Sequence, residues 1–180
     1  MAVRIKTLNL VYIALFAVLI AICSWIAIPT VVPFTLQTFA VYLTVTLLGW
    51  KRGLAAICVY ILLGLVGVPV FSGFRTGMGV LAGPTGGYII GFLFLALIMG
   101  AIIHCFGNGK MILFIAMLLG TIVCYAFGTM WYLLVYAQTT EPVGWLTALS
   151  LCVFPFILPD ILKMLLAIFI SKRLLPYIKN

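Results

Sequence analysis

The sequence has few charged side chains, and acidic ones are almost absent. Only 7% of its 180 residues are charged, two of them acidic and ten Lys or Arg, against about 25% in soluble globular domains. A soluble chain of this length would still expose roughly 30% of its unfolded surface and would need polar side chains to cover it. With 67% hydrophobic residues and a mean hydropathy of +1.40, the composition instead predicts an all-α integral membrane protein.

The same scarcity excludes several kinds of active site. The sequence offers no second carboxylate near Asp160, no nucleophile paired with a base and no Cys/His metal cluster. Its five cysteines form no C-x-x-C pattern and lie in or beside apolar runs, as small buried side chains do. Gly77, Gly79 and Gly83 have the wrong spacing for a dinucleotide fingerprint, and no P-loop is present. We therefore predict a protein that is not an enzyme and has no metal or cofactor.

Six apolar runs predict a bundle of transmembrane helices. A span needs about 20 apolar residues, at a rise of 1.5 Å each, to cross roughly 30 Å of hydrocarbon. The predicted spans are 8–28, 35–50, 53–68, 85–105, 111–137 and 146–171. The second and third are short, so we expect a tight hairpin between them. We thus predict a single domain over residues 1–180, a bundle of six transmembrane helices.

Positive charges are unevenly distributed over the predicted connections. If the N-terminus is cytoplasmic, Arg75 is the one cation in an outer loop, and the acid Glu141 also lies outside. The inner cations are then Arg4, Lys6, Lys51, Arg52, Lys110, Lys172, Arg173 and Lys179. This positive-inside bias predicts that both termini are cytoplasmic. The cations stand singly or in pairs between apolar runs, which excludes the basic stripe of a nucleic-acid-binding protein.

Segment 69–87, PVFSGFRTGMGVLAGPTGG, is rich in glycine. Such residues permit positive φ and close backbone approach, which leaves amide and carbonyl groups, as at Gly73, free to face a ligand. Apolar side chains such as Phe71 and Phe74 are disfavoured in water, so we predict an ordered outer loop between the third and fourth helices. A flexible solvated loop is the alternative. Arg75 within this segment is a candidate partner for an anionic ligand.

Asp160 and Lys163 are two charges inside the last apolar run, FPFILPDILKMLL. Residues three apart share one face of a helix. The pair lies about 18 Å of helix rise before Lys172, near the bilayer midplane or somewhat outward. Each charge costs roughly 2.5–3.5 kcal/mol there, so the pair predicts a ligand site on a substrate pathway. A structural ion pair that only fixes helix packing is the alternative.

Other residues are candidates for ligand contact or helix packing. Polar side chains at the outer starts of the second and fourth spans are expected to face the same cavity; they are Thr35, Gln37, Thr85 and Tyr88. The first span has a face of small residues that either packs internally or docks another membrane subunit; they are Ala14, Ala17 and Ala21. A ridge on the fifth span favours close helix packing; its residues are Ala116, Gly120, Cys124 and Gly128.

Two motifs together resemble those of the BioY family. GVPVFSGFRTGMGVLAGPTGGYIIGF covers residues 67–92 and PDILKMLLA covers residues 159–167, and the likeness extends over almost the whole chain. BioY proteins are the biotin-specific substrate-binding subunits (S-components) of prokaryotic energy-coupling-factor (ECF) transporters. The resemblance implies a bundle in the cytoplasmic membrane that binds biotin near its outer face. It also implies docking, through an A-x-x-x-A surface matched by Ala17–Ala21, on a transmembrane coupling subunit joined to two ATPase subunits.

The chemistry of biotin suits the candidate residues. Asp160 can accept hydrogen bonds from the ureido N–H groups, and Lys163 can donate to the ureido carbonyl or to a carboxylate. Arg75 and Lys163 compete for the biotin carboxylate. Two alternatives remain: an autonomous ion-coupled transporter with Asp160 as its ion site, and an intramembrane enzyme or assembly factor with Asp160 as an acid or base.

Overall fold

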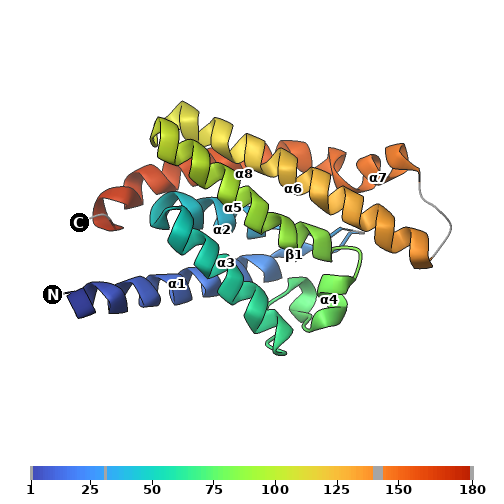
Figure 1. Ribbon diagram of the computed structural model, residues 1–180. Helices are drawn as coiled ribbons and strands as arrows, with labels where there is room; N and C mark the ends of the chain where they lie inside the picture. The colour runs from blue at the N-terminus through green and yellow to red at the C-terminus, as the bar shows by residue number, and fades with distance from the viewer. Residues whose placement is uncertain (1, 31, 140–143, 179–180) are drawn as a thin grey trace.

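The computed structural model describes residues 2–30, 32–139 and 144–178, which are mostly helical (Figure 1). The longer helices are α1 (Ala2–Trp25), α2 (Gln37–Leu48), α3 (Trp50–Leu65), α5 (Gly86–Phe106), α6 (Lys110–Thr139) and α8 (Phe154–Ile178). The shorter ones are the 3-10 helix η1 (Ser72–Phe74), α4 (Met78–Ala82) and α7 (Trp145–Cys152). Two short strands, β1 (Ala27–Ile28) and β2 (Phe34–Thr35), pair antiparallel. The all-helical expectation is confirmed, apart from this small hairpin.

Four segments of the described chain are long and apolar enough to cross a membrane. They are Thr7–Trp25, Gly86–Phe106, Lys110–Val135 and Trp145–Tyr177. By contrast α2 has 12 residues and α3 has 16, and the chain turns sharply between them at Gly49, where φ is +77°. A 12-residue helix rises only about 18 Å, less than the hydrocarbon thickness. The six-span count is therefore not confirmed by helix length, although the predicted hairpin between α2 and α3 is present.

The last predicted span differs from the expectation of one continuous helix. It is divided into α7 and α8 at Val153, whose φ of −125° and ψ of −58° lie outside the helical region. Proline in the first turn of a helix is tolerated, and the residue before a proline is biased away from helix, so Pro155 favours a new helix start here. Pro159 lies inside α8 and lacks an N–H to donate to the preceding turn.

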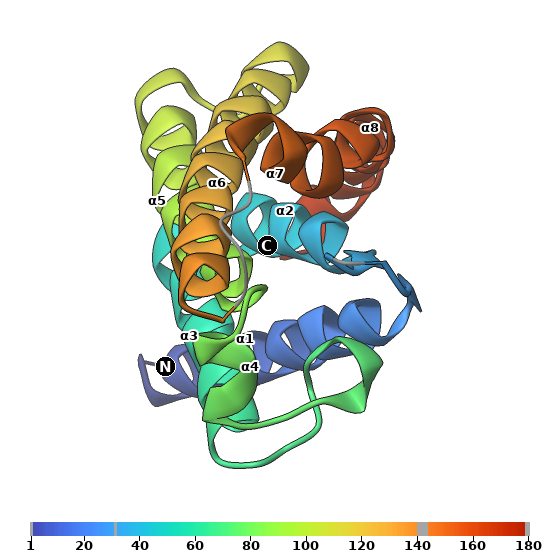
Figure 2. The ribbon, with the colours of Figure 1, turned by 90° about the vertical axis from the view of Figure 1, so that its right-hand side faces the viewer.

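Helix α2 is at the centre of the bundle. It lies among α1, α3, α5 and α8 and contacts all four (Figure 2). Nearly all of its side chains are buried. The start of α1 and the end of α8, together with the α2–α3 and α5–α6 turns, lie at one end of the molecule (Figure 1). The β1–β2 hairpin, α4 and α7 lie toward the other end. This arrangement separates the predicted inner connections from the Gly-rich segment.

Helices α5 and α6 pack closely because small residues line their interface. A Cβ atom on Gly128 would lie 2.3 Å from the Tyr88 ring, and one on Gly91 would lie 2.8 Å from Sγ of Cys124. A Cβ atom on Gly120 would lie 3.1 Å from Leu95. The predicted small-residue ridge on the fifth span is thus confirmed, and it sets the position of Tyr88.

The Gly-rich segment folds into η1, α4 and tight turns. Gly73 and Gly77 have φ of +72° and +86°, a region that other residues rarely adopt. Hydrogen bonds return the segment to the end of α3, where the carbonyl of Gly64 accepts from the Gly77 amide at 2.8 Å and from the Thr76 hydroxyl at 3.1 Å. The ring of Phe71 lies over Gly64, which has no side chain to exclude it.

Candidate functional site

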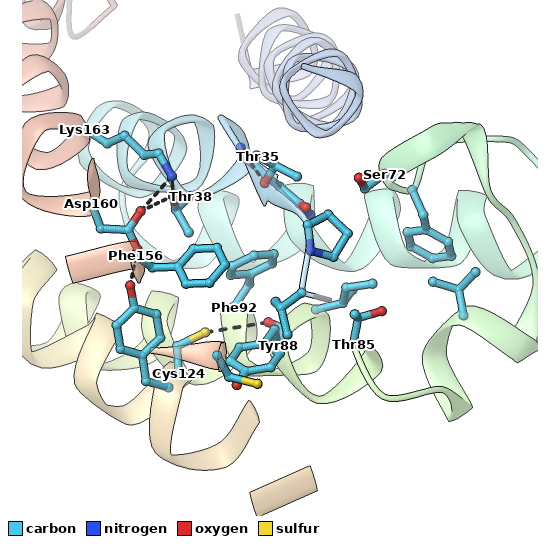
Figure 3. Close-up of a pocket in the computed structure, with 18 of the residues that line it drawn as sticks. Thr35, Thr38, Ser72, Thr85, Tyr88, Phe92, Cys124, Phe156, Asp160 and Lys163 are labelled. Carbon is cyan, nitrogen blue, oxygen red and sulfur yellow. Dashed lines mark hydrogen bonds and ion pairs between the residues drawn. The ribbon is translucent and has the colours of Figure 1, made fainter. Parts of the chain in front are cut away.

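A cavity extends from the Gly-rich segment to the Asp160–Lys163 pair (Figure 3). Its empty space, including the part open to solvent, is about 680 Å³. In Figure 3 the charged pair lies at one end of the cavity and Ser72 and Thr85 at the other. The aromatic rings between these ends are those of Tyr88, Phe92 and Phe156. The cavity therefore has polar ends and an apolar middle.

The cavity brings together six of the seven residues predicted to contact a ligand. They are Gln37, Arg75, Thr85, Tyr88, Asp160 and Lys163. Thr35, also expected there, is part of the wall. The seventh residue, Gly73, is not among the lining residues; it lies in η1, where its positive φ allows the chain to turn. Its contribution to the site is thus conformational in this structure.

Asp160 and Lys163 form a buried ion pair on the first half of α8. Their exposed fractions are 2% and 6%, and Nζ of Lys163 is 2.7 Å from Oδ1 of Asp160. The i,i+3 spacing on a helix places the two side chains on one face, as predicted. The ring of Phe34 in β2 lies over the ammonium, with its centroid 4.3 Å from Nζ. A pair of charges is thus held next to the cavity, where burial makes each dependent on the other.

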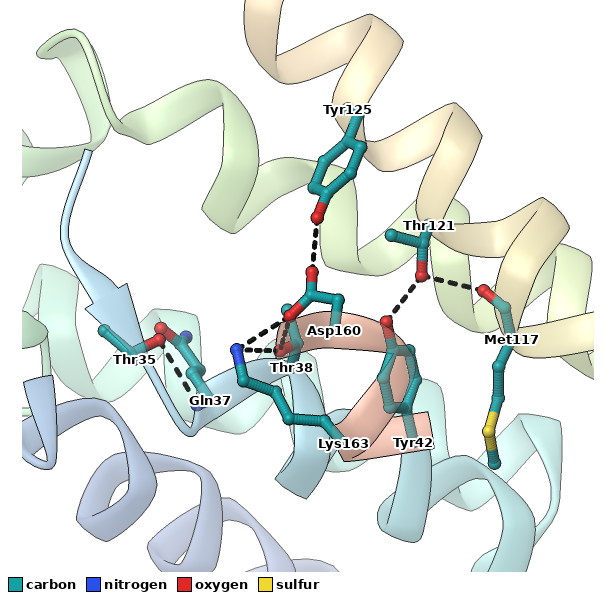
Figure 4. A network of polar contacts seen from close by, with 9 residues as sticks. All are labelled: Thr35, Gln37, Thr38, Tyr42, Met117, Thr121, Tyr125, Asp160 and Lys163. Atoms are coloured by element: carbon teal, nitrogen blue, oxygen red, sulfur yellow. Dashed lines mark hydrogen bonds and ion pairs between the residues drawn. The ribbon is translucent and has the colours of Figure 1, made fainter. Parts of the chain in front are cut away.

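Two side chains that sequence reasoning missed hold the Asp160 carboxylate (Figure 4). The Thr38 hydroxyl in α2 donates to Oδ1 at 3.1 Å and accepts from Lys163 at 3.1 Å. The Tyr125 hydroxyl in α6 donates to Oδ2 at 2.5 Å. Thr38 follows Gln37 directly, and Tyr125 interrupts an apolar span. Polar residues inside predicted spans were the signal that could have identified both.

The Asp160–Lys163 pair keeps one hydrogen-bond acceptor and one donor free for a ligand. Oδ1 of Asp160 accepts two bonds and Oδ2 accepts one, so one lone pair on Oδ2 remains for a ligand N–H. Lys163 has three N–H groups and uses two of them, on Asp160 and Thr38. The pair can therefore present one acceptor beside one donor, which suits a ligand edge that carries N–H next to C=O.

Gln37 has an unmet hydrogen bond in the cavity wall. Among the described residues, two buried side-chain atoms lack a hydrogen-bond partner: Nε2 of Gln37 and the hydroxyl oxygen of Tyr60. An unsatisfied buried donor costs about 1–3 kcal/mol, so such atoms commonly mark a position where a ligand or water binds. Gln37 lines the cavity, but Nε2 itself is buried, so its side chain would have to turn before a ligand acceptor could reach the amide.

Arg75 provides the positive charge at the opposite end. Its Nε donates to the carbonyl of Ser72 at 3.1 Å, and the side chain is exposed. Within the described part of the chain, its terminal amino groups make no hydrogen bond or ion pair. They are therefore available for a carboxylate, which guanidinium binds in bidentate fashion.

The face of small residues on α1 is mostly buried within the chain, whereas a docking surface must be exposed. Ala17 and Ala21 are 1% and 4% exposed and belong to the core that α1 shares with its neighbours, whereas Ala14 is exposed. A side chain buried within its own chain is not offered to a partner. This favours the internal-packing alternative for Ala17 and Ala21, and leaves docking as a prediction for the exposed side of α1 near Ala14.

Glu141, predicted to be outside, falls beyond the described residues.

Comparisons with known proteins agree over nearly the full length. The sequence model of the BioY family matches residues 1–180. Biotin transporter BioY2 of Lactococcus lactis subsp. cremoris is 39% identical over 162 residues, which cover 89% of this chain and 86% of that protein. Biotin transporter BioY of Thermotoga maritima is 36% identical over 168 residues, covering 92% and 95%.

The fold is also similar to a solved structure. The crystal structure of the S-component for biotin from an ECF-type ABC transporter superposes with a TM-score of 0.86. It covers 97% of this chain and 94% of that chain, at 29% sequence identity.

Proposed function

The chain belongs to the BioY family, and from this premise we propose that it binds biotin and takes it up across a membrane as the S-component of an ECF-type transporter. It is a transporter subunit, not an enzyme. The observation that carries this proposal is the buried Asp160–Lys163 pair at one end of the cavity.

The polarity of the cavity supports biotin as its ligand. Biotin has a ureido group at one end, an apolar bicyclic body and a valerate carboxylate at the other end. The remaining acceptor of Asp160 and donor of Lys163 match an N–H and the carbonyl of the ureido group. Tyr88, Phe92 and Phe156 would surround the apolar body.

The carboxylate of biotin is assigned to Arg75 in this proposal. Lys163 is already bonded to Asp160 and Thr38, and it lies at the ureido end. Arg75 lies at the other end beside Ser72, with terminal N–H groups available. In this proposal Lys163 binds the ureido end of biotin and Arg75 binds the carboxylate, so the two cations do not compete for the same group. Gln37 adds a further polar side chain to the cavity wall.

The membrane arrangement that we infer rests on the distribution of positive charge. We infer six spans in the cytoplasmic membrane of a prokaryote, with both termini on the cytoplasmic side and the Gly-rich segment as an outer cap. Single cysteines introduced for Lys51 or Lys110 in a cysteine-free background should react with membrane-impermeant thiol reagents only from inside. One introduced for Arg75 should react from outside. Labelling of either terminus from outside would refute this orientation.

Energy coupling must come from other subunits in this proposal. The sequence contains no nucleotide-binding motif, so partners of the ECF type, a transmembrane coupling subunit and two ATPase subunits, would supply ATP hydrolysis. The exposed side of α1, which carries Leu8, Val11 and Leu15, is apolar and would suit contact with such a transmembrane subunit.

Two measurements test the function. The purified chain should bind labelled biotin saturably, and proteoliposomes should accumulate biotin only when the coupling subunit, the ATPases and ATP are also present. Absence of saturable binding by well-folded protein would refute the proposal. Uptake by the chain alone that follows an ion gradient would instead support the autonomous transporter.

A further inference from the structure

A second, shallower hollow adjoins the ligand cavity on the side of the Gly-rich segment. Its wall includes Thr76, Gly79 and Gly83. Three residues line both spaces: Arg75, Val80 and Thr85. The two spaces therefore share this part of their walls, and Arg75 borders both of them.

The hollow is open because glycine occupies its wall. No atom lies within 4 Å of the position that a Cβ on Gly79 would take. Gly83, another residue of the wall, is anchored by a hydrogen bond. Nε1 of Trp131 in α6 donates to its carbonyl at 3.0 Å. This bond ties one wall residue of the hollow to α6, while α4 leaves the space at Gly79 unfilled.

Arg75 determines what can extend into the hollow. In the proposed function its guanidinium binds the carboxylate of biotin, at the end of the ligand farthest from Asp160. A group attached to that carboxylate would continue outward past Arg75 and enter the hollow. The threonine hydroxyls and peptide groups there, with access to solvent, suit a polar substituent rather than an apolar chain.

We propose that this hollow is an outer subsite for substituents on the biotin carboxylate, so that the chain binds biotin amides of amino acids as well as free biotin. The proposal rests on the proposed function, because it requires the ureido group at Asp160 and Lys163. An amide carbonyl still accepts a hydrogen bond from Arg75. It carries no charge, however, and charge-assisted bonds are about twice as strong as neutral ones. We expect biotin joined to the ε-amine of lysine to bind about tenfold more weakly than biotin.

A side chain that fills the hollow should weaken the binding of biotinyl-lysine and leave the binding of biotin nearly unchanged. Gly79 lies in α4 with an ordinary helical φ and has room for a side chain, so Gly79→Leu narrows the subsite without backbone strain. Ala82→Leu is the matched control, because Ala82 is exposed on the same short helix and lines neither space.

The test is displacement of labelled biotin from the purified chain by biotin, by biotinyl-lysine and by free lysine. We expect biotinyl-lysine to compete with the parent and with Ala82→Leu. In Gly79→Leu its affinity should fall more than tenfold, while that of biotin stays within about twofold of the parent. Failure of biotinyl-lysine to compete at a thousandfold excess over biotin, or an equal loss of both ligands in Gly79→Leu, would overturn the subsite. If labelled biotin itself does not bind to the folded parent, the proposed function fails instead.

Discussion

At the scale of single residues, the site depends on the buried pair of Asp160 and Lys163. Asp160→Asn and Lys163→Met should each remove a charge-assisted hydrogen bond to biotin, which contributes on the order of 1.5–3 kcal/mol, or roughly 10- to 150-fold in affinity. Each single change also leaves the other charge buried and unpaired, which destabilises the fold. Binding must therefore be measured by titration on protein that is monodisperse in detergent.

The double variant Asp160→Asn/Lys163→Met separates the site from a structural ion pair. Removing both charges should restore stability relative to the single changes, because no charge is left unpaired. Biotin binding should remain weak if the pair contacts the ligand. A well-folded double variant whose biotin affinity lies within about twofold of the parent would show that the pair only fixes helix packing.

Tyr125 should act as a positioning residue for Asp160. Tyr125→Phe removes the 2.5 Å hydrogen bond to Oδ2 and leaves the carboxylate freer to rotate, so we expect biotin to bind roughly 3- to 10-fold more weakly. Tyr42→Phe is the matched control. The Tyr42 hydroxyl is bonded to Thr121, which itself donates to the carbonyl of Met117, and not to the pair. Equal loss of affinity in the two variants would contradict this role.

The site residues that the sequence predicted most clearly are those of a type that is rare in membrane helices. Asp160, Lys163 and Arg75 stand out because a charge in or beside an apolar span has a high cost. Thr38 and Tyr125 are individually common in membrane helices, and only the packing of α2 and α6 against α8 places them on the carboxylate.

At the scale of elements, the contact between α5 and α6 positions part of the cavity wall. Gly128→Leu would force a side chain into the ring of Tyr88, and overpacking of this kind costs typically 1–3 kcal/mol. We expect a lower unfolding temperature in detergent and weaker biotin binding, since Tyr88 lines the cavity. Ala126→Leu, exposed on the same helix, should change neither quantity. A Gly128→Leu protein as stable as the parent would show that the two helices can separate at little cost.

The helices themselves were predicted well where they are long and uniformly apolar, as α5 and α6 are. Prediction was poorer where tertiary contacts determine the boundaries. The break at Val153 lies inside a mostly apolar run, and its one local signal is Pro155, which a continuous helix can also tolerate with a kink. The β1–β2 hairpin has only two residues in each strand and no alternating pattern, so periodicity gave no sign of it.

At the scale of the whole molecule, assembly with partners is expected to use the exposed side of α1. Ala14→Trp adds bulk to that side and should impair ATP-dependent uptake in proteoliposomes while equilibrium biotin binding stays near that of the parent. Ala17→Trp places the same bulk in the core, so it should lower stability and binding together. If Ala17→Trp instead abolished uptake while leaving stability and binding intact, Ala17 would belong to the docking surface after all.

The N-terminal end of α2 affects the electrostatics of the charged pair. Its first two residues, Gln37 and Thr38, lie at the cavity, so the positive end of the helix macrodipole, about half an elementary charge, is directed at the Asp160 carboxylate. This field persists when Lys163 is replaced, and it opposes the ammonium when Asp160 is replaced. The two single variants are therefore not equivalent: Lys163→Met should retain more stability than Asp160→Asn, by an amount on the order of 1 kcal/mol.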